Sequence, residues 1–269
     1  MITVFVRKAN FMKILTIGDI FGQIGRNAVE EELERMRGKY DFVIANAENA
    51  SHGRGMTKPV YEQLSAAGID AFTLGNHTWG CPDIATVMRY NSNVVRPANF
   101  EGDVPGCGST VITAKNGVRI GVINLIGRTY MQCCASSPFF SADKEISRIK
   151  SDTDLIFVDF HAEATSEKIA LGYYLDGRVT AVFGTHTHVQ TADSKILPKG
   201  SGYISDLGMT GPAVSVLGLE KQTIIDRFLN GMPQKFTVAN SRGQFCAAIF
   251  DIDDNTMTVS SIERIYKEY

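Results

Sequence analysis

Polar residues of the kinds that bind metal ions follow five apolar, β-rich runs of the sequence, and this feature constrains the fold most strongly. In open α/β sheets, ligands bind in the crevice outside the carboxyl ends of the strands. Five strand ends of such a core would therefore direct their side chains to one place. The five polar ends are Gly18-Asp19, Asn46-Ala47-Glu48-Asn49, Gly75-Asn76-His77, His161 and Gly184-Thr185-His186-Thr187-His188.

Predicted helices alternate with these runs. A helix is expected after Gly25, with Ala28, Leu33 and Met36 on one face and Gly38 as its stop signal. Strands that alternate with helices indicate an α/β core with parallel strands. The expected strands are 13–18, 41–47, 70–75, 154–160 and 179–184, and the other expected helices are 59–67, 82–90, 141–151 and 165–174.

Two β-hairpins interrupt this alternation. Asn116-Gly117 is a strong signal for a tight hairpin turn, and a second turn is expected at Asp253-Asp254-Asn255. Two mixed sheets packed on each other, with helices outside, would account for the mixture, which is a four-layer α/β/β/α sandwich. The hairpin strands are expected at 110–114 and 118–125, and at 244–251 and 256–266.

No repeat or linker divides the chain, so residues 12–269 are expected to form one domain. The first residues keep two interpretations. Either Met12 is an original start, which makes 1–11 an N-terminal extension, or Ile2–Val6 forms a short edge strand.

The composition excludes several classes of protein. The chain has 269 residues and a formal net charge of −2, which does not suit DNA binding through a broad basic face. No apolar run approaches the ~20 residues that span a membrane. The five cysteines include no CxxC pair, which fits a reducing compartment, so a cytoplasmic, bacterial-type enzyme is expected. The adjacent Cys133 and Cys134 are interpreted as small buried residues rather than as a redox pair.

The types of side chain indicate a pair of metal ions. In an extended chain His186 and His188 point the same way, ~6–7 Å apart at the backbone. That separation suits one histidine for each of two metals ~3.5–4 Å apart. Two such cations repel each other, so an anionic group must bridge them, and Asp19 and Glu48 are the available carboxylates. Carboxylate, amide and imidazole ligands without a thiolate favour iron or manganese over a structural zinc.

Two residues near these motifs each keep two interpretations. His52 lies in the loop Ser51–Gly55 and either lines the cleft or is an ordinary loop residue. Arg128 follows a predicted strand and either steadies a phosphate or is a surface charge.

Several of these motifs, in this order, resemble those of the calcineurin-like metallophosphoesterases. Most members have Asp-x-His at the first strand, where this chain has Asp19-Ile20-Phe21, and a bridging Asp at the second, where it has Glu48-Asn49. These departures, together with HAEATSEK at 161–168 and SDLGMTGP at 205–212, resemble the YmdB-like bacterial phosphodiesterases. The resemblance extends from Met12 to the C-terminus.

The resemblance implies two metal sites that share Glu48 as a bridging ligand. Asn49 would take the place of the missing histidine, and His77 would face the substrate without binding metal. The resemblance also implies iron as the usual metal, cyclic nucleotides of the 2′,3′-cyclic AMP type as substrates, and a homo-oligomer, either dimer or tetramer. The implied ligands are Asp19, Glu48, Asn49 and His188 for one metal, and Glu48, Asn76, His161 and His186 for the other.

A hydrolytic mechanism follows as a hypothesis. A hydroxide shared by the two metals would attack phosphorus in line with the leaving oxygen, and His77 would protonate that oxygen. General acids contribute ~10²–10⁴ in rate. Two other functions stay open: a phosphomonoesterase such as a nucleotidase on the same metals, and a regulatory RNA-binding or protein-binding chain that uses the metals as structural staples.

Overall fold

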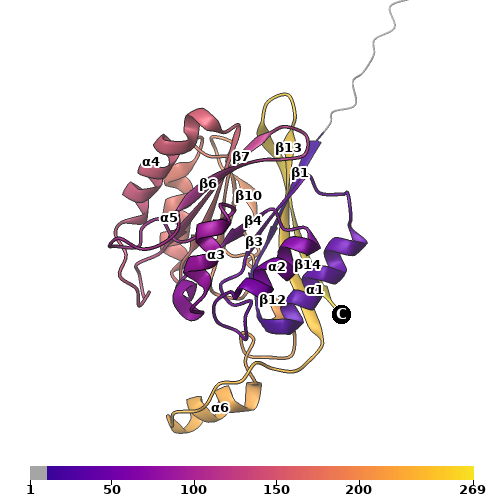
Figure 1. Ribbon diagram of the computed structural model, residues 1–269, viewed down its shortest axis with the longest axis vertical. Coiled ribbons are helices and arrows are strands. Elements are labelled where there is room, and N and C mark those ends of the chain that lie inside the picture. The colour runs from indigo at the N-terminus through magenta and orange to yellow at the C-terminus, as the bar shows by residue number, and fades with distance from the viewer. Residues whose placement is uncertain (1–10) are drawn as a thin grey trace, which may run out of the picture.

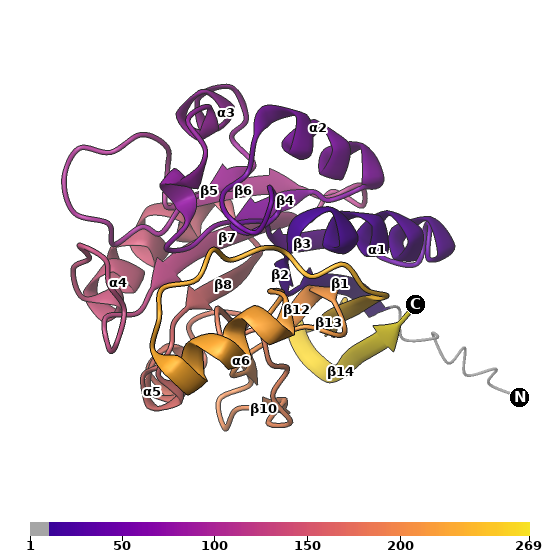
Figure 2. The ribbon, with the colours of Figure 1, turned by 90° about the horizontal axis from the view of Figure 1, so that it is seen from below.

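Two β-sheets form the centre of the chain, and the computed structural model describes residues 11–269 (Figure 1). Helices cover the outer face of each sheet (Figure 2). The layers are therefore helix, sheet, sheet and helix, which confirms the predicted α/β/β/α arrangement. Residues 1–10 lie outside the described part of the chain, and so do the two interpretations of the N-terminal segment that rest on them.

The first sheet is mixed and has eight strands. In spatial order they are β2 (Asp19–Ile20), β12 (Met209–Pro212), β13 (Gly243–Asp253), β1 (Phe11–Ile17), β3 (Phe42–Asn46), β4 (Ala71–Thr73) and β5 (Val94–Val95), with β14 (Thr258–Glu268) paired to β13. β1, β3 and β4 are parallel neighbours, so their carboxyl ends meet at one edge. β13 pairs antiparallel with both β1 and β14, which confirms the predicted C-terminal hairpin.

The second sheet has six strands. In spatial order they are β10 (Lys195–Ile196), β11 (Gly202–Ile204), β9 (Ala181–Thr185), β8 (Leu155–His161), β7 (Arg119–Ile126) and β6 (Ser109–Thr113). β7, β8 and β9 are parallel. β6 and β7 form the predicted hairpin, and Gly117 in its turn has a φ of 88°, a conformation that glycine adopts without strain.

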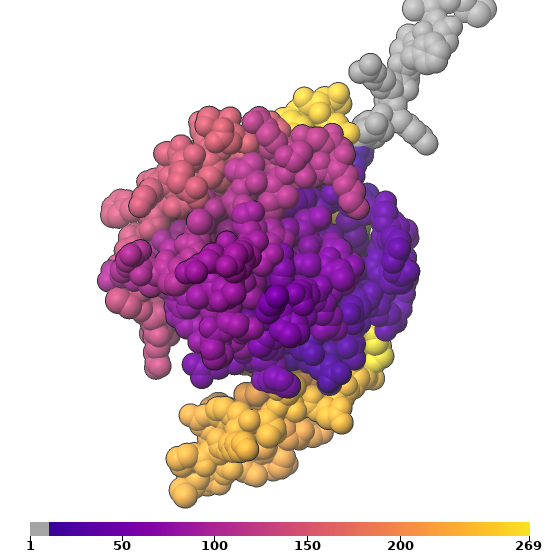
Figure 3. All heavy atoms as spheres, in the orientation of Figure 1, coloured from indigo at the N-terminus to yellow at the C-terminus, as the bar shows by residue number. Residues whose placement is uncertain are grey.

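Six α-helices and two short 3₁₀ helices connect the strands in the described part of the chain. They are α1 (Gly22–Arg35), α2 (Lys58–Ala67), η1 (Thr78–Gly80), α3 (Ile84–Tyr90), α4 (Pro138–Ile149), η2 (Lys150–Asp152), α5 (Thr165–Leu175) and α6 (Lys221–Asn230). Figure 2 shows α1, α2 and α3 on the side of the first sheet, and α4 and α5 on the side of the second. α6 projects away from the body of the molecule (Figures 1 and 3).

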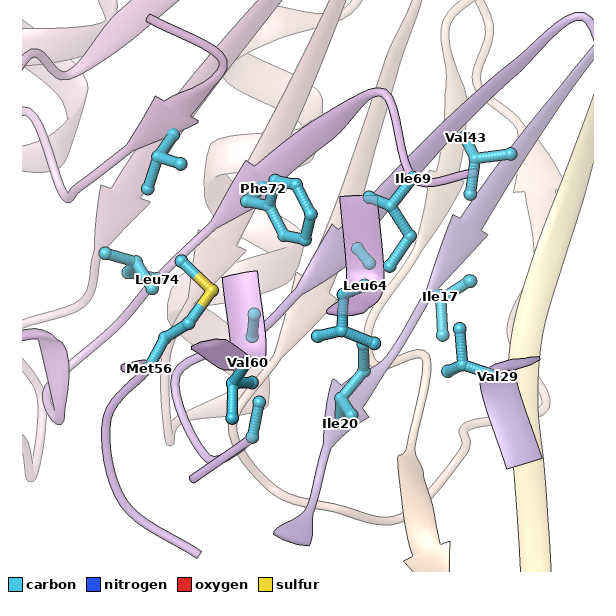
Figure 4. Close-up of a cluster of buried hydrophobic side chains, with 14 of the residues drawn as sticks. Ile17, Ile20, Val29, Val43, Met56, Val60, Leu64, Ile69, Phe72 and Leu74 are labelled. Carbon is cyan, nitrogen blue, oxygen red and sulfur yellow. The ribbon is translucent and has the colours of Figure 1, made fainter. Parts of the chain in front are cut away.

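The core consists of three apolar layers that join these elements. Under α1 and α2, Val29 and Leu64 pack with Phe72 of the first sheet (Figure 4). Between the two sheets, Phe157 and Phe250 meet edge to face with ring centroids 5.7 Å apart. The two sheets are thus bound together by a shared apolar layer rather than by loops.

The start of α1 differs from the prediction. The helix begins at Gly22 instead of after Gly25, and it ends at Arg35, before Gly38. A Cβ atom at Gly25 would lie only 2.2 Å from the carbonyl oxygen of Thr210. Gly25 therefore permits close contact between α1 and β12 from inside the helix, and it does not mark the helix start.

The sequence patterns predict no element between residues 185 and 243, where the structure has α6 and the short strands β10, β11 and β12. Ile224 is the one buried residue of α6, whereas Phe228 and Leu229 are exposed. A helix with so little buried surface lacks the apolar periodicity that reveals helices in a sequence. Within the described residues, no helix has both the length and the apolar character needed to cross a membrane.

Candidate metal centre

The five polar strand ends meet at one place, where the carboxyl edges of the two sheets adjoin. Asp19 follows β1, Glu48 and Asn49 follow β3, and Asn76 follows β4. From the second sheet, His161 ends β8, and the segment of His186 and His188 follows β9. All seven side chains that the sequence nominates as ligands therefore lie at or just after the carboxyl ends of parallel strands of the two sheets.

Four of these side chains surround one point. Nε2 of His161 lies 2.8 Å from Oδ1 of Asn76, 3.0 Å from Nδ1 of His186 and 3.1 Å from Oε1 of Glu48. The ligand atoms of Glu48, His161 and His186 all lie within 4.8 Å of one another. Several lone pairs directed at one point repel each other unless a cation lies between them, so this group fits a metal ion.

A second group lies beside the first. Nε2 of His188 is 3.3 Å from Oδ1 of Asn49 and 3.8 Å from Oδ1 of Asp19. Asp19 is fully buried, and its Oδ1 atom has no hydrogen-bond partner. A buried acceptor without a partner is costly, and a cation bound to His188 and Asn49 would remove that cost.

The outer hydrogen bond of His161 determines which ring nitrogen faces the cluster. Oγ1 of Thr185 donates to Oδ1 of Asp159 at 2.7 Å, so it accepts from Nδ1 of His161 at 2.9 Å. Nδ1 therefore carries the proton, and Nε2 presents its lone pair to the cluster.

The other two imidazoles are held in the same manner. Nδ1 of His188 donates to the carbonyl oxygen of Leu217 at 3.1 Å, which leaves Nε2 free to bind metal. Nε2 of His186 lies 3.1 Å from a carboxylate oxygen of Glu163, which leaves Nδ1 on the cluster side. Metal-binding histidines almost always donate their second ring nitrogen to such a partner.

Burial disfavours every charge in the cluster. Burial raises the pKa of Asp19 well above its usual value, and the carboxyls of Asp206 and Glu48 raise it further. Burial also raises the pKa of Glu48, lowers that of His186 to about 3 and lowers that of His161 well below its usual value. The imidazoles are thus neutral, as metal ligands must be, and a bound cation would restore the ionised carboxylates.

The backbone of the His-x-His segment contradicts the prediction of an extended chain. β9 ends at Thr185, and the φ angles of His186 and His188 are 101° and 63°. The N–H of His186 donates to Oδ2 of Asp19 at 3.0 Å, and that of Thr187 to Asp206 at 3.1 Å. These two buried carboxylates hold the backbone in a turn, so the shared direction of the two imidazoles does not come from strand alternation.

His77 occupies a different position from the seven nominated ligands. Its backbone N–H donates to Oε2 of Glu48 at 2.8 Å, which fixes the residue beside the cluster. Its ring lines the cavity, and Nδ1 is buried without a hydrogen-bond partner. The ring nitrogens make no contact within hydrogen-bond distance with the described ligand atoms, so the ring is available to a molecule bound in the cavity.

A cavity of about 610 Å³ opens over the cluster. This volume lies within the ~300–1,000 Å³ of small-molecule sites. His52 lines the cavity, which favours the cleft interpretation over that of an ordinary loop residue. The side chains that line the cavity include the polar residues His52, Arg54, His77 and Glu163 and the apolar residues Phe21, Leu217, Leu219, Phe236 and Val238.

Arg128 does not line the cavity. It is exposed, and its backbone N–H donates to the carboxylate of Glu167 at 3.0 Å, which favours the surface-charge interpretation. The interpretation of Cys133 and Cys134 as buried residues was wrong: Cys133 is partly exposed and Cys134 is exposed. Cys134 can be exposed because Sγ lies 3.3 Å from the carboxylate of Glu101, a polar contact at the surface.

Sequence reasoning missed the residues that hold the imidazoles. Glu163 lies two residues after His161 in the run HAEATSEK, so its position near a ligand is visible in the sequence. Thr185 ends β9 next to His186, so its position near a ligand is also visible in the sequence, whereas Asp159 lies inside β8, where its sequence position resembles that of an ordinary core residue. The contact of Leu217 uses a backbone carbonyl, for which no residue type is a signal.

Two facing sheets with outer helices, and a cluster of carboxylate, amide and imidazole groups at their carboxyl edge, define a metallophosphoesterase of the calcineurin-like class. The family model described as YmdB-like protein matches residues 15–265. The chain therefore belongs to the YmdB-like family, as the motifs predict.

Sequence and structural similarity to two other bacterial proteins supports this membership. The chain is 50% identical over 256 residues, covering 94% of this chain and 96% of the relative, to a protein of Bacillus subtilis (strain 168) named 2′,3′-cyclic-nucleotide 2′-phosphodiesterase. A crystal structure of a novel phosphatase from Mycoplasma pneumoniae matches with a TM-score of 0.90 and 39% identity, covering 97% of this chain and 95% of that one.

A hypothetical protein from Thermus thermophilus has the same fold, with a TM-score of 0.90 and 38% identity over 96% of this chain and 99% of that one. Both the Bacillus subtilis relative and the Mycoplasma pneumoniae structure are named for phosphoesterase activities. The predicted enzyme class, a phosphoric-ester hydrolase of the phosphodiesterase type, is thereby confirmed.

Proposed function

We propose that the chain hydrolyses 2′,3′-cyclic nucleotides, with 2′,3′-cyclic AMP as the representative substrate, and releases the nucleoside 3′-phosphate. The observation that carries the proposal is the cluster of inward-facing ligand atoms at the floor of a cavity of nucleotide size. The name of the Bacillus subtilis relative, which matches almost the whole chain, supplies the bond that is broken, the one to the 2′ oxygen.

Two metal ions are the proposed cofactors, with iron as the metal and manganese as the alternative, because the ligands are oxygen and nitrogen atoms without a thiolate. The fit rests on the unpartnered Oδ1 of Asp19 and on the close approach of the ligand atoms around His161. The proposed ligands are Asp19, Glu48, Asn49 and His188 for one ion, and Glu48, Asn76, His161 and His186 for the other.

When bound, such ions lower the pKa of a water molecule and neutralise negative charge on a phosphate. The protein supplies the rest. Asp19 and Glu48 balance the positive charge, and the cavity places a phosphodiester over the cluster. His77 donates a proton from its ring to the departing 2′ oxygen, so that the alkoxide never forms.

The test is a metal analysis of purified protein together with a panel of substrates. We expect two equivalents of metal per chain and turnover of 2′,3′-cyclic AMP, with 3′-AMP identified as the product by ³¹P NMR. The 2′-AMP isomer as the product would contradict the proposed bond, and a metal-loaded protein without turnover would contradict the function.

A phosphomonoesterase is the second candidate, because the Mycoplasma pneumoniae structure is that of a protein called a phosphatase. The same panel separates the two. A monoesterase would convert 2′-AMP and 3′-AMP to adenosine faster than it opens the cyclic phosphate, and a phosphodiesterase would leave 3′-AMP unchanged.

A further inference from the structure

We propose that the apolar wall of the cavity binds the nucleobase of the substrate by stacking, and that Phe236 is its main specificity-determining residue. The wall consists of Leu217, Leu219, Phe236 and Val238. The inference rests on the proposed function, because a base would reach this wall when the phosphate of the same molecule lies over the metal cluster.

The wall belongs to an arm, defined as residues 213–240, that leaves the first sheet after β12 and returns before β13. Its two limbs are joined by backbone hydrogen bonds: Ala239 donates to Gly218, and Glu220 donates to Thr237, both at 2.9 Å. α6 forms the tip and extends away from the body (Figures 1 and 3). Because the limbs are paired, the side chains near their base hold a fixed place at the cavity.

The base of the arm is attached to the metal cluster. The carbonyl oxygen of Leu217 accepts from Nδ1 of His188, and the ring of Phe21 meets that of His188 edge to face at 5.6 Å. A Cβ atom at Gly218 would lie 2.7 Å from the ring of Phe21, so the glycine lets the arm lie against Phe21. The wall and the cluster are therefore two sides of one cavity.

The wall is apolar although it is accessible. Leu217 is 48% exposed and Phe236 is 42% exposed, and both line the cavity. The guanidinium of Arg227 lies 4.9 Å from the ring centroid of Phe236, a cation–π contact that helps to orient the ring. Exposed apolar groups that gather beside a charged cluster mark a site for a ligand with one apolar end and one charged end.

A nucleoside cyclic phosphate has those two ends, since its phosphate is anionic and its base is flat and aromatic. None of the four wall side chains donates or accepts a hydrogen bond, so the wall binds a base without hydrogen bonds to the edge that distinguishes one base from another. Every base has a π-face, and stacking on an aromatic side chain tolerates all of them. We therefore expect selection for nucleosides over base-free esters, with a modest preference for purines, which stack more strongly.

The test compares 2′,3′-cyclic AMP with the 2′,3′-cyclic phosphate of methyl riboside, which has no base. Phe236→Ala is expected to raise the KM for the nucleotide about tenfold, in line with the loss of one base-stacking contact, while kcat stays unchanged. Turnover of the base-free ester is expected to stay unchanged. Phe236→Leu, which keeps an apolar surface, is expected to lose less than Phe236→Ala.

Phe228→Ala is the matched control, because Phe228 is 85% exposed on α6 of the same arm and does not line the cavity. It is expected to behave as the unchanged protein on both substrates. An equal loss on both substrates for Phe236→Ala, or the same KM effect for Phe228→Ala, would overturn the assignment of the wall.

A binding measurement with adenosine tests the wall independently of the proposed hydrolysis. If the unchanged protein opens neither cyclic ester, the proposed function fails, and the wall is then tested by saturation-transfer NMR with adenosine. Signals from the base protons that are present with the unchanged protein and absent with Phe236→Ala support the wall. Equal signals in both proteins overturn it.

Discussion

Each of the three clustered imidazoles uses one ring nitrogen for a partner outside the cluster. Those partners are the hydroxyl of Thr185, the carbonyl of Leu217 and the carboxylate of Glu163. The three differ in chemistry, and the carboxylate is the one that a substitution removes without disturbing a strand or the backbone.

We expect Glu163→Gln to weaken metal binding ~10–100-fold, the usual cost of losing a partner of a metal-binding histidine. The carboxylate makes the ring of His186 more basic and holds its orientation. Equilibrium dialysis with Mn²⁺ measures the affinity. Glu167→Gln is the control, since it removes the same charge nearby while its carboxylate accepts its hydrogen bonds from the backbone N–H groups of 128 and 129 and not from an imidazole. An unchanged affinity in Glu163→Gln would show that the carboxylate does not act through His186.

His77→Ala should retain both metals and lose turnover by ~10²–10⁴, the typical contribution of a general acid. No hydrogen bond joins the side chain of His77 to the nominated ligands, and its backbone bond to Glu48 survives the substitution. Metal content by mass spectrometry and turnover of 2′,3′-cyclic AMP are measured on the same sample. Loss of metal in the variant would identify His77 as a ligand.

The buried carboxyls predict how the metal-free chain responds to pH. Burial raises the pKa of Asp159 to about 7, and it also raises the pKa of Asp19 and Glu48. A carboxyl whose pKa is raised on folding contributes stability that is present below its unfolded pKa and is lost as the pH rises through its folded pKa. For Asp159 this loss begins near an ordinary aspartate pKa of ~3.9 and is complete above about 7.

Chelation should therefore lower the Tm more above pH ~7 than near pH ~5. The imidazoles are neutral in both the metal-free and the metal-loaded protein, so they change the two Tm values with pH in the same direction. The pH dependence of the difference between the two Tm values therefore reports the titration of the carboxyls. Asp159→Asn in the metal-free protein should flatten the decline of Tm with rising pH. The same slope with and without the substitution would show that Asp159 does not titrate in this range.

At the level of elements, the sequence predicts best where one physical rule governs a segment. The central strands β1, β3, β4, β8 and β9, the two hairpins and the helices that lie on the sheets follow from apolar periodicity and from turn residues such as Asn116-Gly117. The strand ends also predict which side chains gather at the cluster. These are local patterns, and burial in the sheets reinforces each of them.

The errors have tertiary causes. Gly25 stands at the place of a helix boundary in the sequence, yet it serves a contact between α1 and β12 that depends on a residue far along the chain. His186 and His188 follow a strand, yet hydrogen bonds to the carboxylates of Asp19 and Asp206 turn the backbone. The arm of residues 213–240 buries little surface of its own, so no periodicity reveals it.

The contact of α1 with β12 gives a prediction against helix propensity. Gly25→Ala should destabilise the chain by about 1–3 kcal/mol, the usual cost of overpacking, although alanine favours a helix by about 1 kcal/mol. The added methyl group would collide with the carbonyl of Thr210. Denaturant unfolding measures the free energy. Asn27→Ala, at an exposed position of the same helix, should leave the protein slightly more stable. A more stable Gly25→Ala protein would show that α1 and β12 can move apart to accept the methyl group without a loss of stability.

At the scale of the whole molecule, we infer that residues 12–269 form one domain. The apolar layer between the sheets contains Ile14, Phe157 and Phe250, which come from the beginning, the middle and the end of the chain. β1 also pairs with β13, so the two ends share one sheet. If water reached the inner face of one sheet, the inner face of the other sheet would also be exposed.

The metal-free chain should therefore unfold in one cooperative transition. Far-UV circular dichroism, fluorescence of the single tryptophan Trp79 near the first sheet, and hydrogen exchange of β8 in the second sheet should report the same midpoint. Separate midpoints for Trp79 and β8 would mean that the two sheets are independent units.

The pairing of β1 with β13 has a consequence for biosynthesis. Asp19 emerges from the ribosome early, yet β2, on which it lies, pairs with β12, and its neighbour β1 needs β13, which ends at Asp253. A nascent chain folds as its segments are released, at about 5–20 residues per second. The surroundings of Asp19 therefore form only after residues up to Asp253 have been synthesised, and the proposed metal ions would bind as one of the last steps in the maturation of the protein.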